Sequence, residues 1–170
     1  MANTHKTSIK TRQVAVLVAP GFASAELSSL KTTLEAQGAV VHLVSEVLGP
    51  IAATGGPPAE ANKSFLTVAS VLFDAVYVPG GAASVQALAA GGSAAPFLQE
   101  TFRHCKAIGA TGDAVPWVQK VLGLDQPTIG VNLGVVWGQP SELDTFTQGF
   151  VAAVAEHRHW QREHVTPPRF

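Results

Sequence analysis

Two segments of this sequence carry residue types that could perform acid–base or nucleophilic chemistry. Glu26 lies shortly after the apolar run 14–19, and a second apolar run leads into the small residues 108–112 just before a helical pattern begins. Many α/β enzymes hold an exposed nucleophile on such a strand-to-helix turn, within reach of a general base. Residues 108–112, however, include neither Cys nor Ser. The sequence therefore predicts an enzyme-like scaffold that lacks the usual reactive atom.

Two side chains near this turn could replace the missing nucleophile, alone or with Glu26 as a base. Thr111 carries a hydroxyl, but we expect it to cap the following helix, with Asp113 in the first turn. Cys105 lies at the entry to the strand, and free cysteines are mostly small buried side chains. Glu26 can accept backbone N–H bonds at a helix start, and a base without a nucleophile needs a substrate water. We therefore favour structural roles for Glu26, Thr111 and Cys105 over catalytic ones.

Neither a metal site nor a dinucleotide site is predicted. His157 and His159 point to different sides of a helix, whereas metal-binding pairs usually lie four residues apart, so we expect surface or tail roles for them and for His164. Gly80 and Gly81 lack the further glycines of a dinucleotide-binding loop.

The composition limits the classes of protein to which this chain can belong. The 170 residues, 46% hydrophobic and 14% charged, suffice for one compact domain. The formal net charge of −1 gives no electrostatic reason to bind nucleic acid or an anionic membrane. The apolar runs are far shorter than the roughly 20 residues of a membrane span. A single cysteine and the absence of an apolar segment in residues 1–12 predict a cytoplasmic protein.

The order of apolar runs predicts the architecture. Buried strands are expected at 14–19, 40–44, 75–78, 107–110 and 128–131, and helices are expected around 27–34, 85–88, 95–104, 114–122 and 142–160. Residues 49–58 suggest an irregular or hairpin excursion. Strands that alternate with helices predict a single α/β domain over 13–161, a doubly wound parallel sheet with helices on both faces. Residues 1–12 are expected to form a flexible arm or linker remnant, and 162–170 an irregular tail.

The chain resembles the ThiJ/PfpI superfamily, related to class I glutamine amidotransferases, in the run 14–22 with Glu26, in Val78-Pro79-Gly80-Gly81 and in 107–112. This resemblance implies a flavodoxin-like fold in which a Glu contacts a Cys on the turn after the fourth strand. Glu26 matches that Glu, and Gly109 is expected at the position of that Cys. Glu26, Gly109, Ala110 and Thr111 would then form a vestigial site, a pseudo-active site.

A narrower resemblance is to the C-terminal domain of large-subunit haem catalases, carried by segments 9–15, 48–50, 70–76, 102–109 and 157–160. It implies a non-catalytic accessory domain, linked to oxidative stress, that stabilises the assembly, shapes access to the haem domain and is chaperone-like on its own. Expected partners are the catalase core, another copy of the chain, or unfolded client proteins. Haem would belong to the preceding catalase core, so no cofactor is expected here. The alternative is a ThiJ/PfpI-type hydrolase or glyoxalase-like enzyme that uses Glu26 with Cys105 or Thr111.

Overall fold

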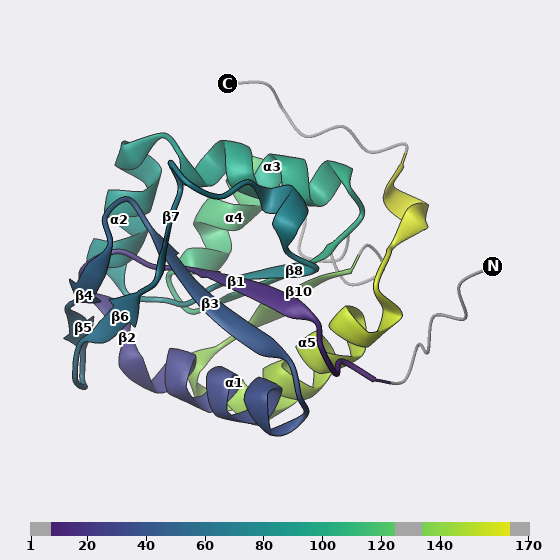
Figure 1. Cartoon of the computed structure of the whole chain (residues 1–170), viewed down its shortest axis with the longest axis horizontal. Helices are drawn as coiled ribbons and strands as arrows, with labels where there is room; N and C mark the ends of the chain where they lie inside the picture. The colour runs from purple at the N-terminus through teal and green to yellow at the C-terminus, as the bar shows by residue number, and fades with distance from the viewer. Residues whose placement is uncertain (1–7, 125–133, 164–170) are drawn as a thin grey trace.

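A six-stranded parallel sheet forms the centre of the protein (Figure 1), as seen in a computed structural model that describes residues 8–124 and 134–163. Its strand order is β10-β9-β8-β1-β3-β7. The bounds are Gln13–Leu17 for β1, Val40–Ser45 for β3, Lys63–Ser64 for β7, Ala75–Val78 for β8, Ala107–Thr111 for β9 and Val135–Gly138 for β10. The chain between β3 and β7 forms the expected hairpin excursion, in which β4 (Gly49–Ile51) pairs antiparallel with β6 (Ala59–Ala61), while β5 (Ala53–Thr54) pairs with β2 (Phe22–Ala23).

Helices cover both faces of the sheet (Figure 1). Helices α1 (Ser24–Ala36) and α5 (Leu143–Glu156) lie on one face, and α2 (Ala82–Gly91), α3 (Ala94–Arg103) and α4 (Ala114–Leu122) lie on the other. Short 3-10 turns follow at Ser70–Leu72, Pro140–Glu142 and Trp160–Arg162. The predicted doubly wound α/β fold is confirmed.

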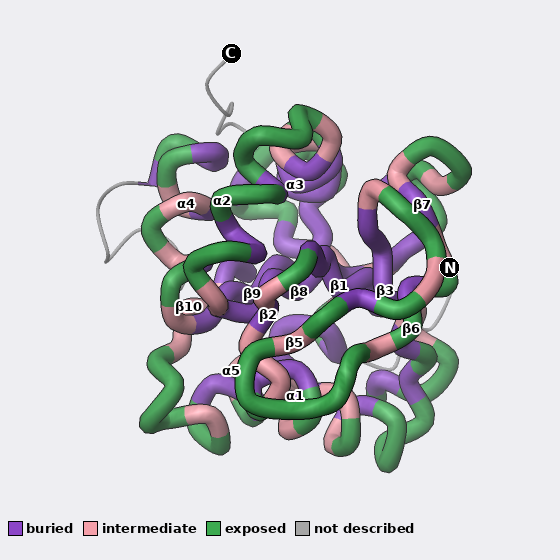
Figure 2. The backbone as a smooth tube through the Cα atoms, turned by 90° about the vertical axis from the view of Figure 1, so that its left-hand side faces the viewer, coloured by how far each residue is buried: buried purple, intermediate pink, exposed green. Residues whose placement is uncertain are grey.

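Strand periodicity divides the core into two halves. Along β1, Val14 and Val16 pack with the cluster under α1 and α5, whereas Ala15 and Leu17 pack with the cluster under α2, α3 and α4. Alternate residues of a strand face opposite sides of a sheet, so a strand buried on both faces must be apolar throughout. Figure 2 shows the consequence: the sheet is buried, and the outward surfaces of the helices are exposed. No helix in residues 8–124 or 134–163 is long and apolar enough to span a bilayer.

The C-terminal end differs from the sequence-based expectation. Helix α5 ends at Glu156, because His157 has a positive φ of 72°, which is incompatible with a right-handed helix. The expected helix over 142–160 is therefore too long by four residues at its end. The chain then returns toward the sheet, and the His159 N–H donates to the Cys105 carbonyl at 2.7 Å. Arg162 is buried. Strand β10 was not anticipated, and the expected strand at 128–131 lies outside the described residues.

Packed structure begins earlier than Gln13. Ile9 is buried with the α1 and α5 cluster, and the Thr11 N–H donates to the Gly38 carbonyl at 2.8 Å. The part of the 1–12 segment that the structure describes therefore includes an apolar anchor, Ile9, which a polar composition does not reveal.

Candidate functional site

The carboxyl ends of β8 and β9 meet the first turn of α1 at one edge of the sheet. Glu26 is in that first turn, Gly80 follows β8, and Thr111 is the last residue of β9. Parallel strands place their carboxyl ends along one edge, where α/β proteins commonly hold their sites. The structure thus brings together Glu26 and Thr111, which lie 85 positions apart in the sequence.

A chain of hydrogen bonds converges on Glu26. Its Oε2 atom accepts from the Gly80 N–H at 2.5 Å and from the Thr111 hydroxyl at 2.6 Å. The Thr111 Oγ1 atom lies 2.7 Å from the Tyr77 hydroxyl. Glu26 is 4% exposed, and Thr111 and Tyr77 are fully buried. Because the Thr111 proton points to Glu26, the Tyr77 hydroxyl is the donor to Thr111.

Tyr77 keeps its proton in this setting. Burial raises the pKa of Tyr77 far above its ordinary value, and the nearby Glu26 carboxylate adds to the rise, although the hydrogen bond with Thr111 acts in the opposite direction. A protonated tyrosine can donate but cannot serve as a base. The chain of hydrogen bonds is therefore suited to holding Glu26 in place. Tyr77 and the Gly80 N–H were not anticipated as parts of the site, because a tyrosine inside an apolar run carries no local signal of a polar partner.

Thr111 does not cap helix α4, contrary to expectation. The residue before the first turn of α4 is Asp113, and it makes no side-chain capping bond. Thr111 instead ends β9 with its side chain turned inward to Glu26. The capping prediction failed because Gly112 and Asp113 separate Thr111 from the helix.

The turn residue that faces Glu26 is Gly112. It has a left-handed φ of 55°, and a Cβ atom built on it would lie 2.8 Å from Glu26 Oε1. Gly109 lies two residues inside β9, where an added Cβ would meet the Phe150 ring at 2.7 Å and the Phe146 ring at 2.9 Å. The expected assignment of Gly109 to the nucleophile position is therefore corrected to Gly112. A glycine directly before a helix start was the available signal, because strand-to-helix turns of this kind favour a left-handed residue.

Ala110 and Cys105 do not join the site. Ala110 is buried in β9 within the core cluster on the α2, α3 and α4 side. Cys105 precedes the amino end of β9, so about six residues at 3.3 Å each, roughly 20 Å, separate it from Thr111. Its thiol is buried, and its N–H donates to the Phe102 carbonyl. The hypothesis that Cys105 acts with Glu26 is therefore wrong.

Tyr77 does not offer its hydroxyl to a haem. Tyr77 is the only tyrosine of the chain, and its hydroxyl is enclosed between β8 and β9 by Thr111. A haem iron could reach this oxygen only if the core opened. Tyr77 therefore does not fit the role of an axial tyrosine in a haem site.

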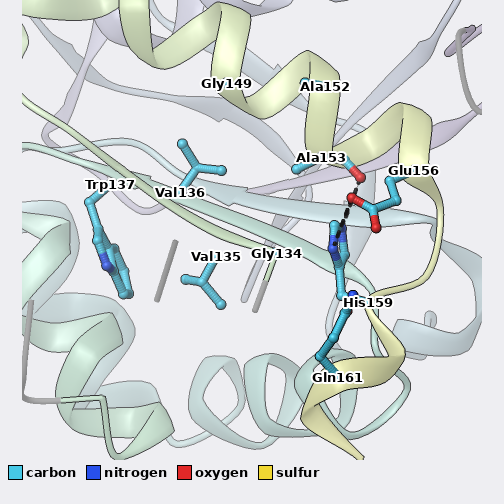
Figure 3. Close-up of a pocket in the computed structure, with 10 residues that line it drawn as sticks. All are labelled: Gly134, Val135, Val136, Trp137, Gly149, Ala152, Ala153, Glu156, His159 and Gln161. Atoms are coloured by element: carbon cyan, nitrogen blue, oxygen red, sulfur yellow. Dashed lines mark hydrogen bonds and ion pairs between the residues drawn. The ribbon is translucent and has the colours of Figure 1, made fainter. Parts of the chain in front are cut away.

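A separate cavity of about 460 Å³ lies along β10 and α5 (Figure 3). His159 reaches into its wall, where its Nε2 atom lies 3.0 Å from the Ala153 carbonyl and its Nδ1 atom 3.6 Å from Glu156. Burial lowers the pKa of His159, although the Ala153 carbonyl and Glu156 act in the opposite direction. The expected surface role of His159 is wrong: the ring attaches the segment after α5 to that helix. Within the described residues, no three His, Cys, Asp or Glu side chains are grouped so as to hold a metal.

Comparison with known proteins places the chain among catalase segments. Residues 10–164 match the family model of the C-terminal domain found in long catalases. The chain is 38% identical over 165 residues to Catalase-2 of Bacillus subtilis (strain 168), covering 95% of this chain and 22% of that protein. It is 36% identical over 158 residues to Catalase HPII of Pseudomonas aeruginosa, covering 93% of this chain and 21% of that protein. The chain thus spans about a fifth of the length of these relatives.

Solved structures share the fold at low sequence identity. Oxidized DJ-1 of Toxoplasma gondii superposes with a TM-score of 0.72 at 19% identity, covering 90% of this chain and 96% of that one. A ThiJ/PfpI domain protein of Brachyspira murdochii gives 0.70 at 18% identity, covering 85% and 97%. The fold is that of the DJ-1/ThiJ/PfpI proteins, and the chain belongs to the family of C-terminal domains found in long catalases.

Proposed function

We propose that this chain is a non-catalytic accessory domain that stabilises a long catalase and shapes access to its haem domain. The observation that carries the proposal is the family match over 10–164 combined with glycine at position 112. A glycine presents no nucleophile to Glu26, and the Glu26 Oε2 atom already accepts two hydrogen bonds. The compartment proposed is the cytoplasm, on the basis of the single cysteine.

A domain-replacement experiment tests the stabilising role. In Bacillus subtilis Catalase-2, the segment that matches this chain would be deleted, replaced by this chain, or replaced by an unrelated flavodoxin-like domain. We expect the chain to raise the midpoint of thermal inactivation of peroxide decomposition above both controls. Equal midpoints for the three proteins would contradict the proposal.

The access role is tested by measuring the rates at which the same three proteins decompose hydrogen peroxide and a bulkier alkyl peroxide. Altered access to the haem domain would change the ratio of the two rates.

Exposed apolar side chains support the further proposal that the chain binds unfolded clients or another copy of itself. The most exposed are Leu66, Val71, Trp160, Val47, Leu48 and Leu72. Exposed apolar side chains favour contact with other apolar surfaces, because the contact removes them from water. Suppression of aggregation of a heat-denatured client tests this role, and Leu66→Ser and Trp160→Ser should weaken it. Gln86→Ala, on an exposed face of α2, is the control. No protection by the unmodified chain would end this part of the proposal.

A second candidate function is hydrolysis or glyoxalase-like chemistry with Thr111 as nucleophile. The 2.6 Å contact between the Thr111 hydroxyl and Glu26 favours it, because a base must lie within hydrogen-bond reach of its nucleophile. The full burial of Thr111 and its second bond to Tyr77 argue against it. Turnover of p-nitrophenyl acetate or methylglyoxal that disappears in both Thr111→Val and Glu26→Gln would establish the enzyme. We expect no such turnover.

A further inference from the structure

A second cavity, of about 240 Å³, lies at the amino edge of the sheet, opposite the Glu26 site. Its walls come from the 3-10 turn at Ser70–Leu72, the connection between α3 and β9, and the segment that follows α5. Lys106, Arg158, Arg103 and His104 contribute basic side chains to these walls, and Glu163 is the one carboxylate among the lining residues. The cavity therefore has a strongly basic lining in a protein whose net charge is −1.

Two of these cations have no carboxylate partner among the described residues. The Lys106 ammonium donates to the Ser70 carbonyl at 2.9 Å and to the Val71 carbonyl at 3.2 Å, and forms no ion pair in that part of the chain. Arg158 Nη1 donates to the His157 carbonyl at 3.1 Å and lies 3.3 Å from His157 Nδ1. Main-chain carbonyls satisfy hydrogen bonds, but they do not neutralise the charge of a cation.

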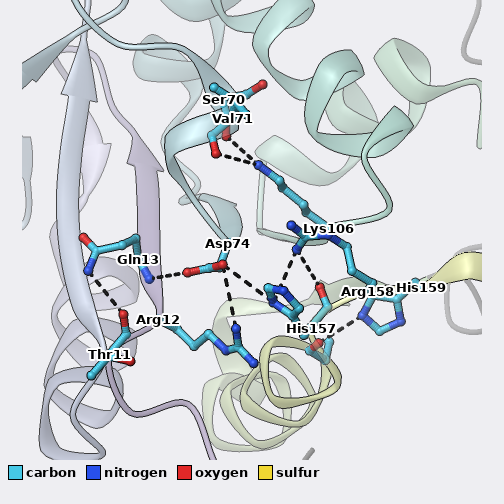
Figure 4. A network of polar contacts seen from close by, with 11 residues as sticks. Thr11, Arg12, Gln13, Ser70, Val71, Asp74, Lys106, His157, Arg158 and His159 are labelled. Carbon is cyan, nitrogen blue, oxygen red and sulfur yellow. Dashed lines mark hydrogen bonds and ion pairs between the residues drawn. The ribbon is translucent and has the colours of Figure 1, made fainter. Parts of the chain in front are cut away.

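Two carboxylates near the cavity, Asp74 and Glu100, are already engaged, and Figure 4 shows the contacts of Asp74. Asp74 accepts the Gln13 N–H at 2.8 Å and pairs with Arg12 at 3.9 Å and with His157 at 3.6 Å. On the other side of the cavity, Glu100 pairs with Arg103 at 2.6 Å and with His104 at 3.6 Å. Lys106 and Arg158 thus contribute two positive charges that Asp74 and Glu100 do not balance, and Glu163 in the cavity wall can offset only one of them.

This arrangement is electrostatically unfavourable without an anion. Lys106 is only 2% exposed, and a buried charge costs free energy unless it is paired. Burial lowers the pKa of Lys106 to about 8, with a further lowering from Arg158 that Asp74 partly offsets. An anion between the two side chains would reverse both effects on Lys106, because it would attract the ammonium and screen it from Arg158.

We propose that this cavity binds a small tetrahedral oxyanion, with phosphate as the model ligand, between Lys106 and Arg158. The ammonium has a third N–H beyond its two carbonyl bonds, and the guanidinium fork of arginine matches the oxygen geometry of a phosphate. The volume suffices, since a water molecule takes about 30 Å³ of liquid and the cavity has about 240 Å³. The site goes beyond the accessory role, since neither Lys106 nor Arg158 is part of the Glu26 network.

Calorimetric titration of the purified chain with phosphate, at constant ionic strength set with chloride, tests the proposal. We expect one phosphate per chain and an increase in the thermal unfolding midpoint that sulfate also produces and chloride does not. Lys106→Met and Arg158→Gln should each weaken binding at least tenfold, about the loss expected for one charge-assisted hydrogen bond. Lys120→Met, an exposed lysine on α4, is the matched control and should bind as the unmodified chain does.

Each outcome of the titrations either supports the anion site or overturns it. Phosphate binding that Lys106→Met and Arg158→Gln lose and Lys120→Met keeps would support the site. Equal binding by all four proteins would overturn it, as would the absence of saturable binding to the unmodified chain. If Lys106→Met failed to fold, Arg158→Gln would still decide, because Arg158 is only partly buried and lies after the end of α5. None of these results depends on whether the chain stabilises a catalase. The accessory role is tested separately, by the domain-replacement experiment.

Discussion

At the residue scale, the bonds from Tyr77 through Thr111 to Glu26 join two strands to a helix. Tyr77 lies opposite Gly109 in the register of β8 and β9, so its ring extends along β9 toward Thr111. The three residues are buried, and the Tyr77 hydroxyl, the Thr111 hydroxyl and Glu26 Oε2 are all hydrogen-bonded, which is the condition under which buried polar groups stabilise a fold. Without a reactive atom at Gly112, the same geometry that would orient a catalytic glutamate has a structural effect.

Thr111→Val should lower the free energy of unfolding by about 2 kcal/mol, the usual cost of leaving buried polar groups unpaired. The valine keeps the shape but removes both the acceptor for Tyr77 and a donor to Glu26. Urea denaturation measures the difference. The control is Thr33→Val on α1, where a half-buried hydroxyl bonds only the Ser29 carbonyl at 3.2 Å, and we expect a change within about 0.5 kcal/mol. Equal losses in the two variants would refute a special role for the Thr111 network.

At the element scale, the close packing of α5 on β9 depends on a residue without a side chain. Phe146 and Phe150 stack with ring centroids 5.8 Å apart, and both lie over Gly109. Tyr77 on β8 adds a third ring, 5.5 Å from Phe146. Gly109 therefore serves helix-to-sheet packing, which explains its presence within a strand, where glycine is otherwise unfavourable.

Gly109→Ala should destabilise the protein by about 1 to 3 kcal/mol, because the added methyl group would overpack the core between β9 and α5. The matched substitution Gly149→Ala, within α5, meets only Val136 at 3.3 Å and gains helix propensity of about 1 kcal/mol. We expect it to be neutral or mildly stabilising. Thermal unfolding of the two variants provides the comparison, and a neutral Gly109→Ala would show that the rings can move aside.

At the scale of the whole molecule, charge is unevenly distributed between the two edges of the sheet. The carboxyl edge holds the buried Glu26, whereas the amino edge holds Lys106, Arg158 and the buried Arg162. Arg162 donates to the Phe102 and Lys106 carbonyls, and its guanidinium lies 4.6 Å from the centre of the Phe102 ring. These contacts draw the segment after α5 onto the sheet and place Arg158 beside the cavity.

The pH dependence of stability should report on Lys106. Its pKa is about 8 in the folded protein against an ordinary 10.5, so between these values the unfolded chain binds more protons. The free energy of unfolding due to this group therefore rises as pH increases through that window, and below about 8 the destabilisation is fully present. Urea titrations across the window should show a smaller rise for Lys106→Met than for Lys120→Met. Identical profiles would mean that Lys106 is not perturbed.

The sequence by itself determined the class of fold and the absence of a Cys or Ser nucleophile from residues 108–112. Apolar runs of strand length that alternate with helical repeats specify a buried parallel sheet, because a strand buried on both faces must be apolar at every position. The helix expected at 114–122 is observed as Ala114–Leu122. Residue types alone exclude Cys and Ser from 108–112. Both properties are local in the chain, and local patterns are sufficient to predict them.

Only the tertiary structure decided which side chains meet. Thr111 contacts Glu26 rather than the next helix, Gly112 rather than Gly109 faces that carboxylate, and Cys105 lies at the far edge of the sheet. The Glu26 contacts connect residues 54 and 85 positions apart, and they depend on strand register and on where each strand ends. A shift of one residue turns a side chain to the opposite face of a sheet, so a site of this kind becomes visible only after the strands are paired.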